Sequence, residues 1–590
     1  MKYHPLILAT LTILVGTTFA SRPNIVLIMT DDQGYGDLGA TGNPLLKTPN
    51  IDAMAKRSGT AKNFYVSPVC APTRASLMTG RYNYRTRCID TYIGRAMMDK
   101  SETTIAEILL GSGYATGIFG KWHLGDCYPM RAMDQGFQES LVLRGGGIGQ
   151  PSDPEGAEGM YTNPVLFLNG KAEKFEGYCT DIYFNNAMDF ISRSKAKEKP
   201  FFIYLPTNAP HGPFHDVPEK DYNDYKEMDL SNQRFPQERG HKLPPKHDQD
   251  QRARIFAMIQ NIDTNVGRMF EHLRTEGIYE DTIVIFMVDN GPNGRRYVAG
   301  HKGMKTFVHE GGTRSPFFLH WPAKVKAGAS TDRIAAHIDI LPTLLAACGV
   351  GVPCGLNLDG RNILPLLTGD CQAAASWEDR MIVIQAHRGD QPMKFHNFYA
   401  RTQDWKLLHA SGFGKEGFTG EPKFELYNMK DDPLELDDVS AKAPAKVAEM
   451  KAAYEKWFED VSSTRPDNYS PPRIHVGAPQ EKVTTLTRQD WRHTKGRPWA
   501  QDSHGYWELY NAKAGGVYDV LIRFRPMEAN AEISLDVGGV SLSKVAGAGA
   551  TAVEFKKVAF GKQGPLRLDC RIRAGETEKG PWQVDVVQSI

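Results

Sequence analysis

Four short runs of the chain are almost entirely apolar, and they constrain the fold more than any other feature. They are Asn24–Met29 (NIVLIM), Ala115–Phe119 (ATGIF), Phe201–Leu205 (FFIYL) and Thr282–Val288 (TIVIFMV). A strand that is apolar on both faces must be covered on both faces, which is typical of parallel sheets. Between these runs, apolar residues recur at helical spacing over 105–111 and 255–273. The sequence therefore predicts an α/β fold with a mostly parallel sheet sandwiched by helices.

Charged and metal-binding residues follow each of the four runs. In chain order they are Asp31 and Asp32, Lys121 and His123, His211, and Asp289 and Asn290. Taken singly, each is what an ordinary turn, cap or solvated histidine looks like. Because the carboxyl ends of parallel strands meet at one edge of a sheet, the set as a whole predicts one shared site.

Four of these residues offer oxygen ligands, namely Asp31, Asp32, Asp289 and Asn290. Neither a thiolate nor an imidazole is among them. Carboxylate and amide oxygens suit calcium or magnesium and suit structural zinc poorly. The donor set therefore predicts a hard cation.

The stretch from Ser67 to Tyr82, SPVCAPTRASLMTGRY, places a cysteine at the start of a predicted helix. Pro72 suits a first helical turn, so Cys70 should lie near the helix N-terminus, where negative charge is favoured. Cys70 has three ordinary interpretations: a buried structural cysteine, half of a disulfide, or a thiolate nucleophile. A soft thiolate is chemically mismatched with hard oxygen donors.

The pattern changes along the chain and predicts several domains. After an α/β domain at 21–379, short alternating segments and one amphipathic helix predict a sheet-plus-helix subdomain at 380–466. A Pro- and Ser-rich linker is expected at 467–480. From 481 to 590, alternating segments separated by Gly-rich turns predict a separable β-sandwich module.

The N-terminus predicts export. Met1 and Lys2 precede an apolar run from Leu6 to Val15, and Thr18-Phe19-Ala20 then places small residues at 18 and 20. This is the pattern of a signal peptide over 1–20, so we expect a periplasmic or extracellular protein. No later run is long and apolar enough to predict a membrane span.

Charge and cysteine content exclude some classes. The chain has 70 Lys and Arg against 69 Asp and Glu, a net charge of +1, so we expect no nucleic-acid partner. The eight cysteines are too scattered for a disulfide scaffold, although Cys348 and Cys354 flank a short loop and could pair. The sequence leaves the oligomeric state open.

Five motifs together resemble the type I sulfatase family of the alkaline phosphatase superfamily. CAPTR at 70–74 with the trailing LMTGR at 77–81 resembles its signature, and GYATGIFGKWHLG at 113–125 its second signature. DDQGYGDLG and DNG resemble its metal segments, and KTFVHEGGTRSP at 305–316 its lysine segment. The resemblance covers about 23–465. It implies that a formylglycine-generating enzyme converts Cys70 to formylglycine, an aldehyde held as its hydrate.

The resemblance also implies roles for the site residues. One calcium ion would be held by Asp31, Asp32, Asp289, Asn290 and residue 70. The hydrate at position 70 would attack sulfur, with Arg74 supporting it. Lys121 and Lys305 would bind sulfate oxygens, Lys302 being an alternative to Lys305. His211 would contact the substrate and protonate the leaving oxygen, and His123 would take the proton that lets sulfate depart.

The substrate is expected to be a sulfated poly- or oligosaccharide. The loop Arg144–Gly156 is Gly-rich and is either a pocket lining or a flexible connection. Aromatic residues of the last module either stack on sugars or form its core; they are Trp499, Tyr506, Trp507, Tyr510 and Trp582. Three alternatives remain: a phosphoester or phosphonate hydrolase of the same superfamily, an arylsulfatase specific for aryl sulfates, and a non-catalytic sugar-binding protein.

Overall fold

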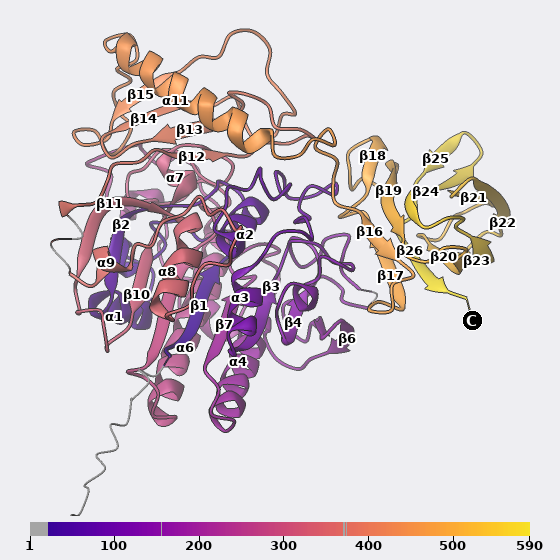
Figure 1. The fold of residues 1–590 in the computed structure, drawn as a ribbon, viewed down its shortest axis with the longest axis horizontal. Helices are drawn as coiled ribbons and strands as arrows, with labels where there is room; N and C mark the ends of the chain where they lie inside the picture. Colours follow the sequence, from indigo (N-terminus) through magenta and orange to yellow (C-terminus); the bar gives the residue numbers. More distant parts are fainter. Residues whose placement is uncertain (1–21, 155, 370–371, 373–374, 590) are drawn as a thin grey trace, which may run out of the picture.

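The computed structural model describes residues 22–154, 156–369, 372 and 375–589, and Figure 1 shows its fold. The predicted signal peptide at 1–20 lies outside these described residues. Within them, no helix combines the length and apolarity that a membrane crossing requires.

The four apolar runs form the centre of an 11-stranded sheet. They are β1 (Asn24–Thr30), β3 (Ala115–Lys121), β7 (Phe201–Pro206) and β8 (Thr282–Val288), parallel and in the order β8-β1-β7-β3. The flanking strands are β10 (Phe317–His320), β2 (Gly59–Tyr65) and β11 (Ser330–Ala336) on one side, and β4 (Glu139–Leu143), β5 (Val165–Leu168) and β6 (Lys171–Lys174) on the other. The eleventh strand, β9 (Arg314–Ser315), pairs with β2 outside this order. The predicted parallel sheet is confirmed, with antiparallel pairings towards both edges.

Helices cover both faces of this sheet (Figure 1). Val26 and Ile28 of β1 pack in one core with α1 (Pro49–Arg57), α4 (Cys179–Lys195) and α6 (Gln249–Thr275). Ile25 and Leu27 point to the opposite core, with α2 (Cys70–Thr79), α3 (Ile105–Gly111) and α8 (Ile340–Ala347). Burial of each such side chain contributes about 1.5–3 kcal/mol. The α/β sandwich predicted from the sequence is therefore confirmed.

A second, four-stranded antiparallel sheet lies at the top of Figure 1 with α11 (Pro444–Ser462). Its strands are β12 (Ile382–Gln385), β13 (Phe398–Arg401), β14 (Trp405–His409) and β15 (Glu425–Asn428). The fully buried Lys406 Nζ lies 3.0 Å from Glu310 Oε1 and 2.7 Å from Glu435 Oε1. Glu310 begins α7 (Glu310–Thr313), so this buried pairing ties the second sheet to the segment that follows Lys305.

The last part of the chain forms two sheets that share one apolar core, and we call residues 474–588 the terminal β module. Its strands are β16 (Ile474–Val476), β17 (Val483–Thr487), β18 (Arg492–Lys495), β19 (His504–Asn511), β20 (Val517–Arg523), β21 (Ala531–Val537), β22 (Val540–Ala546), β23 (Ala552–Ala559), β24 (Gly564–Ala574), β25 (Thr577–Lys579) and β26 (Gln583–Gln588). Residues 474–476, which the sequence assigns to the linker, are instead a strand. Ile474 and Val476 are buried in the core, and β16 pairs with β19.

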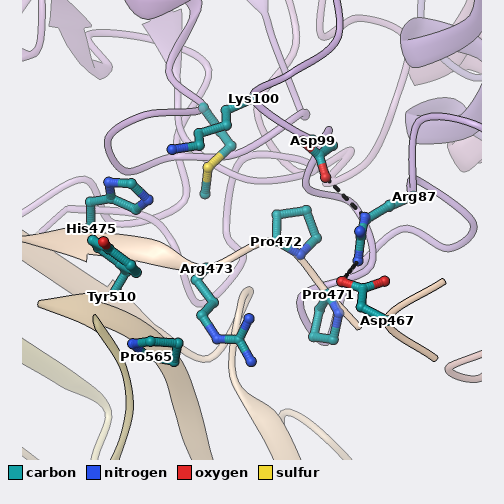
Figure 2. A pocket seen from close by; sticks show the side chains of 11 residues that line it. Arg87, Asp99, Lys100, Asp467, Pro471, Pro472, Arg473, His475, Tyr510 and Pro565 are labelled. Carbon is teal, nitrogen blue, oxygen red and sulfur yellow. Dashed lines mark ion pairs between the residues drawn. The ribbon is translucent and has the colours of Figure 1, made fainter. Parts of the chain in front are cut away.

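The terminal β module lies against the α/β domain at the right of Figure 1. Its core includes Met97, Cys127 and Met130 from that domain. A cavity of about 310 Å³ lies along this boundary. Figure 2 shows side chains that line it, among them Lys100, His475 and Tyr510. At its edge Arg87 pairs with Asp99 at 2.9 Å and with Asp467 of the predicted linker at 2.8 Å. The domain boundaries stay a prediction, and the apolar core of the module continues into the α/β domain.

Cys348 and Cys354 are both free, so the pairing that their spacing permits is absent from the structure. The physical reason is their placement: Cys348 follows α8 directly and packs in the core, whereas Cys354 is exposed. The other described cysteines are also free, and Cys371 lies outside the described residues.

Candidate active site

The ends of the four central strands bring the predicted site residues together. Thr30 at the end of β1 is in register with Val288 at the end of β8, so Asp31 and Asp289 emerge side by side. The Asp289 amide donates to the Thr30 carbonyl at 3.0 Å, and the Asp31 amide donates to the Ala209 carbonyl at 3.3 Å. The predicted convergence of polar residues at one edge of the sheet is what the register produces.

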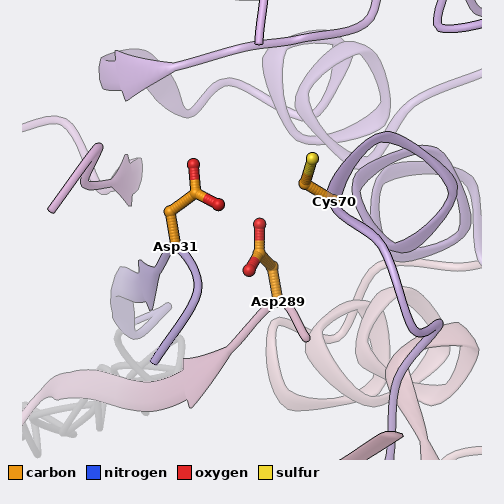
Figure 3. Close-up of side chains that lie close together, drawn as sticks. All are labelled: Asp31, Cys70 and Asp289. Carbon is orange, nitrogen blue, oxygen red and sulfur yellow. The ribbon is translucent and has the colours of Figure 1, made fainter. Parts of the chain in front are cut away.

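Cys70 is the first residue of α2, with Val69 in extended conformation before it. Its sulfur lies with carboxylate oxygens of Asp31 and Asp289 in a group whose atoms are all within 4.8 Å of one another (Figure 3). Burial raises the pKa of the Cys70 thiol, and together with the charges of Asp31 and Asp289 it outweighs the opposing charges of Lys121 and Lys305. A cysteine here would therefore be a neutral thiol, which is a poor nucleophile.

Arg74 lies one helical turn after Cys70 and is fully buried. Its Nη2 donates to Asp289 Oδ2 at 2.8 Å, and its Nη1 donates to the Lys121 carbonyl at 2.5 Å. Thr73, which is not among the predicted site residues, donates from Oγ1 to the Asp289 carbonyl at 2.7 Å. The position of Thr73 in CAPTR could have indicated this contact, because residues three and four positions after Cys70 share its helix face.

Two lysines approach the carboxylates. Lys121 Nζ pairs with Asp31 Oδ2, and Lys305 Nζ lies 2.6 Å from Asp32 Oδ1. Lys302 instead pairs with Glu425 at 3.3 Å and is a third exposed, so of the two candidates Lys305 is the one that reaches the site. Burial alone would lower the pKa of Lys305, but the charge of Asp32 and its hydrogen bond, together with the charges of Cys70 and Asp31, outweigh burial and raise that pKa.

Three buried oxygens of the predicted metal ligands have no hydrogen-bond partner among the described residues. They are Asp31 Oδ1, Asp32 Oδ2 and Asn290 Oδ1. The Asn290 amide nitrogen donates to Asp32 Oδ1 at 2.8 Å, which directs its oxygen elsewhere. Burial, together with the Asp31 charge, raises the pKa of Asp289 to about 7. A buried oxygen without a partner costs free energy, and a hard cation would supply the positive charge that crowded carboxylates lack. These residues therefore fit a hard cation.

The two predicted histidines flank the carboxylates in different states. His123 Nε2 lies 2.8 Å from the Thr91 carbonyl, which can only accept, so Nε2 carries the proton. Its Nδ1 is buried and has no partner in the described part of the chain. Burial lowers the pKa of His123 well below its ordinary value, and Lys121 and Arg74 lower it further. The ring is therefore neutral, with its lone pair on Nδ1.

His211 Nδ1 lies 2.7 Å from the Gly212 carbonyl, so the proton of a neutral ring is on Nδ1. Its Nε2 lies 3.6 Å from Asp32 Oδ2. Burial lowers the pKa of His211, and the nearby Asp32 charge opposes that shift. The nearby His215 is exposed, with Nε2 against the Met160 sulfur.

The Gly-rich loop that begins at Arg144 covers both histidines. A Cβ built on Gly146 would lie 2.7 Å from His123 Cε1, and one on Gly147 would lie 3.0 Å from His211 Cε1. The backbone thus approaches both rings closely. Of the two alternatives left by the sequence, the loop lines the site.

Sequence reasoning missed Gln489, which lies in the terminal β module. Its Nε2 is 3.4 Å from His123 Nε2 and 2.8 Å from the Thr91 carbonyl. No motif or spacing marks it, because the contact spans 366 positions along the chain.

Comparison with protein-family models adds an independent finding. The model described as Sulfatase matches residues 23–350, more than half of the chain. The chain belongs to the sulfatase family. This sulfatase also matches, over residues 301–462, the model described as N-sulphoglucosamine sulphohydrolase, C-terminal.

Similar proteins agree with that assignment. The N-acetylglucosamine-6-O-sulfatase of Bacteroides thetaiotaomicron is 25% identical over 81% of this chain and 91% of its own. The arylsulfatase A of Bos taurus is 30% identical over 75% of this chain and 89% of its own. The crystal structure of Ps i-CgsB in complex with k-i-k-neocarrahexaose is 29% identical, with a TM-score of 0.61, and covers 75% of this chain and 94% of its own.

The chain is thus a type I sulfatase of the alkaline phosphatase superfamily and a sulfuric ester hydrolase. The resemblance drawn from five motifs is confirmed at the level of family and reaction, and the non-catalytic alternative finds no support. The individual roles of the site residues stay predictions.

The two lysines give a matched test. We expect Lys305→Met to lower turnover of nitrophenyl sulfate by about 10²-fold or more, because losing one preorganised group that stabilises developing charge costs about 10²–10³-fold. Lys302→Met removes an ion pair that is partly exposed and should change turnover less than about fivefold. Steady-state assays of the two purified variants measure this, and equal losses in both would contradict the assignment of Lys305.

Proposed function

We propose that this sulfatase is an exported, calcium-dependent enzyme that hydrolyses sulfate esters of carbohydrates with a formylglycine at position 70. The observation that carries the proposal is the position of Cys70 at a helix N-terminus, within reach of Asp31 and Asp289, in a complete CAPTR segment. The signal-peptide pattern at 1–20 supports export.

The state of residue 70 supports conversion. The thiol is buried and its raised pKa keeps it protonated, so cysteine itself has little nucleophilic strength here. A hydrated formylglycine would supply an oxygen nucleophile compatible with the hard donors around it. Arg74 lies one turn further along α2 and would support that group and the Asp289 carboxylate together.

Calcium is the cation we assign to the oxygen set. Asp31, Asp32, Asp289 and Asn290 would hold it with residue 70, and Asp31, Asp32 and Asn290 each have an unpaired buried oxygen. Calcium takes six to eight oxygen ligands in flexible geometry, which suits carboxylates that come from two different loops. When bound, it would lower the pKa of an oxygen ligand and draw negative charge from a sulfate oxygen.

The other side chains would handle charge and protons. Lys121 and Lys305, each paired with one carboxylate, present ammonium groups to the sulfate oxygens. The neutral His123 accepts a proton at Nδ1. His211 delivers a proton from Nε2 to the leaving oxygen; the negative charge of a bound ester favours the protonated ring and counteracts its burial.

The substrate class rests on similarity. The relatives include proteins described as an N-acetylglucosamine-6-O-sulfatase and an N-acetylgalactosamine-6-sulfatase, and the Ps i-CgsB structure holds a neocarrahexaose. A sulfated saccharide is therefore our preferred substrate over an aryl sulfate. A phosphate-ester hydrolase is the rival from the same superfamily. Hydrolysis rates for the sulfate and the phosphate ester of one phenol would separate the two.

Conversion of Cys70 is directly measurable. We expect mass spectrometry of the peptide spanning Cys70 to find the aldehyde or its hydrate in protein made with a formylglycine-generating enzyme. Cys70→Ser should lower turnover by about 10³-fold or more, because serine lacks the second hydroxyl that would let sulfate depart. The exposed Cys354 provides the control, and Cys354→Ser should retain full activity. Full activity with an unmodified thiol at position 70 would contradict the proposed conversion to formylglycine.

Metal content tests the oxygen ligands. We expect elemental analysis to find one calcium ion per chain, and Asp31→Asn to bind calcium at least about tenfold more weakly, since even outer-shell changes cost about 10–100-fold. The control is Asp263→Asn, which changes a buried carboxylate whose Oδ1 accepts from the Ile51 amide at 2.7 Å, away from the site. Stoichiometric zinc, or unchanged calcium binding in Asp31→Asn, would contradict the proposal.

The role of His211 depends on the leaving group. A sugar alkoxide needs a proton in order to depart, whereas nitrophenolate does not. We expect His211→Ala to lower turnover of a sugar sulfate by about 10²–10⁴-fold, and turnover of nitrophenyl sulfate much less. The exposed His215 is the neighbouring control, and His215→Ala should leave both rates unchanged. Equal losses on both substrates in His211→Ala would remove it from the acid role.

A further inference from the structure

A turn of the terminal β module enters the active site. Gln489 lies between β17 and β18, and its side chain is 1% exposed. Its Nε2 donates to the Thr91 carbonyl at 2.8 Å, and the same nitrogen is 3.4 Å from His123 Nε2. Gln489 therefore donates to the same backbone carbonyl of the α/β domain that accepts from His123.

The Thr91 carbonyl accepts two donors at once. A carbonyl oxygen has two lone pairs, and here His123 Nε2 uses one and Gln489 Nε2 uses the other. With both bonds made, the carbonyl has a fixed direction. Because that direction decides where His123 Nε2–H points, it also decides where the unpaired Nδ1 points.

The module holds this turn rigidly. The Trp507 indole donates to the Thr487 carbonyl at 2.8 Å, and the Trp499 indole donates to the Arg488 carbonyl at 3.2 Å. Arg488 in turn donates to the carbonyls of Gly580 and Pro581, each at 2.8 Å. Two aromatics that the sequence left open as sugar platforms thus fix the turn that carries Gln489.

The turn also holds the α/β segment that contains Thr91. The Gly94 amide donates to the Gln489 carbonyl at 3.4 Å, and Arg492 donates to the Ile93 carbonyl. A Cβ built on Gly145, in the Gly-rich loop, would lie 3.6 Å from Gln489 Cγ. Gln489 is thus enclosed by the two segments that surround His123.

We propose that the terminal β module completes the active site, and that Gln489 is a positioning residue that sets the tautomer and orientation of His123 through the Thr91 carbonyl. This rests on the proposed role of His123 as a base. In that role Nδ1 would accept the proton of the remaining hydroxyl at position 70. The O–H electron pair would then form the C=O bond, and sulfate would leave with the electron pair of its C–O bond.

The test is Gln489→Leu, which keeps the side chain's size and removes its amide. We expect kcat to fall about fivefold to tenfold, the effect of one hydrogen bond. The fall should be equal for nitrophenyl sulfate and a sugar sulfate, with KM unchanged or lower, because the base acts after the leaving group has gone. Gln563→Leu is the matched control: Gln563 donates to the Ala512 carbonyl at 3.1 Å within the same module, and this variant should behave as the wild type.

A second measurement needs no formylglycine. Nitrogen NMR of ¹⁵N-histidine-labelled full-length protein, with His123→Gln giving the assignment, reports which ring nitrogen carries the proton. We expect a single Nε2–H tautomer in the wild type and in Gln563→Leu, and a mixture of tautomers in Gln489→Leu. Wild-type kcat and an unchanged His123 tautomer in Gln489→Leu would overturn the inference. Absence of sulfate-ester hydrolysis in converted wild type would instead overturn the proposed function, and the NMR result would still decide the role of Gln489.

Discussion

The compensation of buried charge at the end of the central sheet is the constraint on which the rest of the site depends. Asp31, Asp32 and Asp289 lie together with no exposure to solvent, where carboxylates repel one another and lose their hydration. Arg74, Lys121 and Lys305 supply three positive charges against them. The oxygens that remain unpaired are what a divalent cation would bind.

This balance explains why so many separate segments must be placed accurately. The carboxylates come from the ends of β1 and β8, Lys121 ends β3, Arg74 comes from α2, and Lys305 precedes α7. Each ion pair therefore closes a long loop of chain. The buried Lys406 with Glu310 and Glu435 does the same for the second sheet, since it holds the segment that delivers Lys305. Stability and site geometry are thus set by the same contacts.

The terminal β module fits this view better than it fits an independent binding domain. Its core takes in Met97, Cys127 and Met130 of the α/β domain, and its Gln489 shares the Thr91 carbonyl with His123. These contacts support the proposal that the module completes the active site, while its separability stays a prediction. Trp507 is fully buried in the module core rather than presented to a ligand.

The sequence by itself determined the family, the central strands and the proposed site residues that lie in motifs. Continuous apolar runs are a local signal, and CAPTR places Cys70 and Arg74 on one helix face whatever the rest of the chain does. It could also point to a common edge for Asp31, Lys121, His211 and Asp289, because strand ends meet by rule in a parallel sheet.

Only the tertiary structure decided which of the remaining groups meet. The family resemblance favours Lys305 over Lys302, but only the tertiary structure shows what each one faces: Lys305 pairs with Asp32 and Lys302 with Glu425. The Gly-rich loop lines the candidate active site, because its backbone approaches His123 and His211. Gln489 could not be found at all from the sequence, since its contact joins two domains far apart in the chain and depends on how one surface packs on another. Packing between domains leaves no periodic mark in a single sequence, whereas strands, helix faces and motifs do.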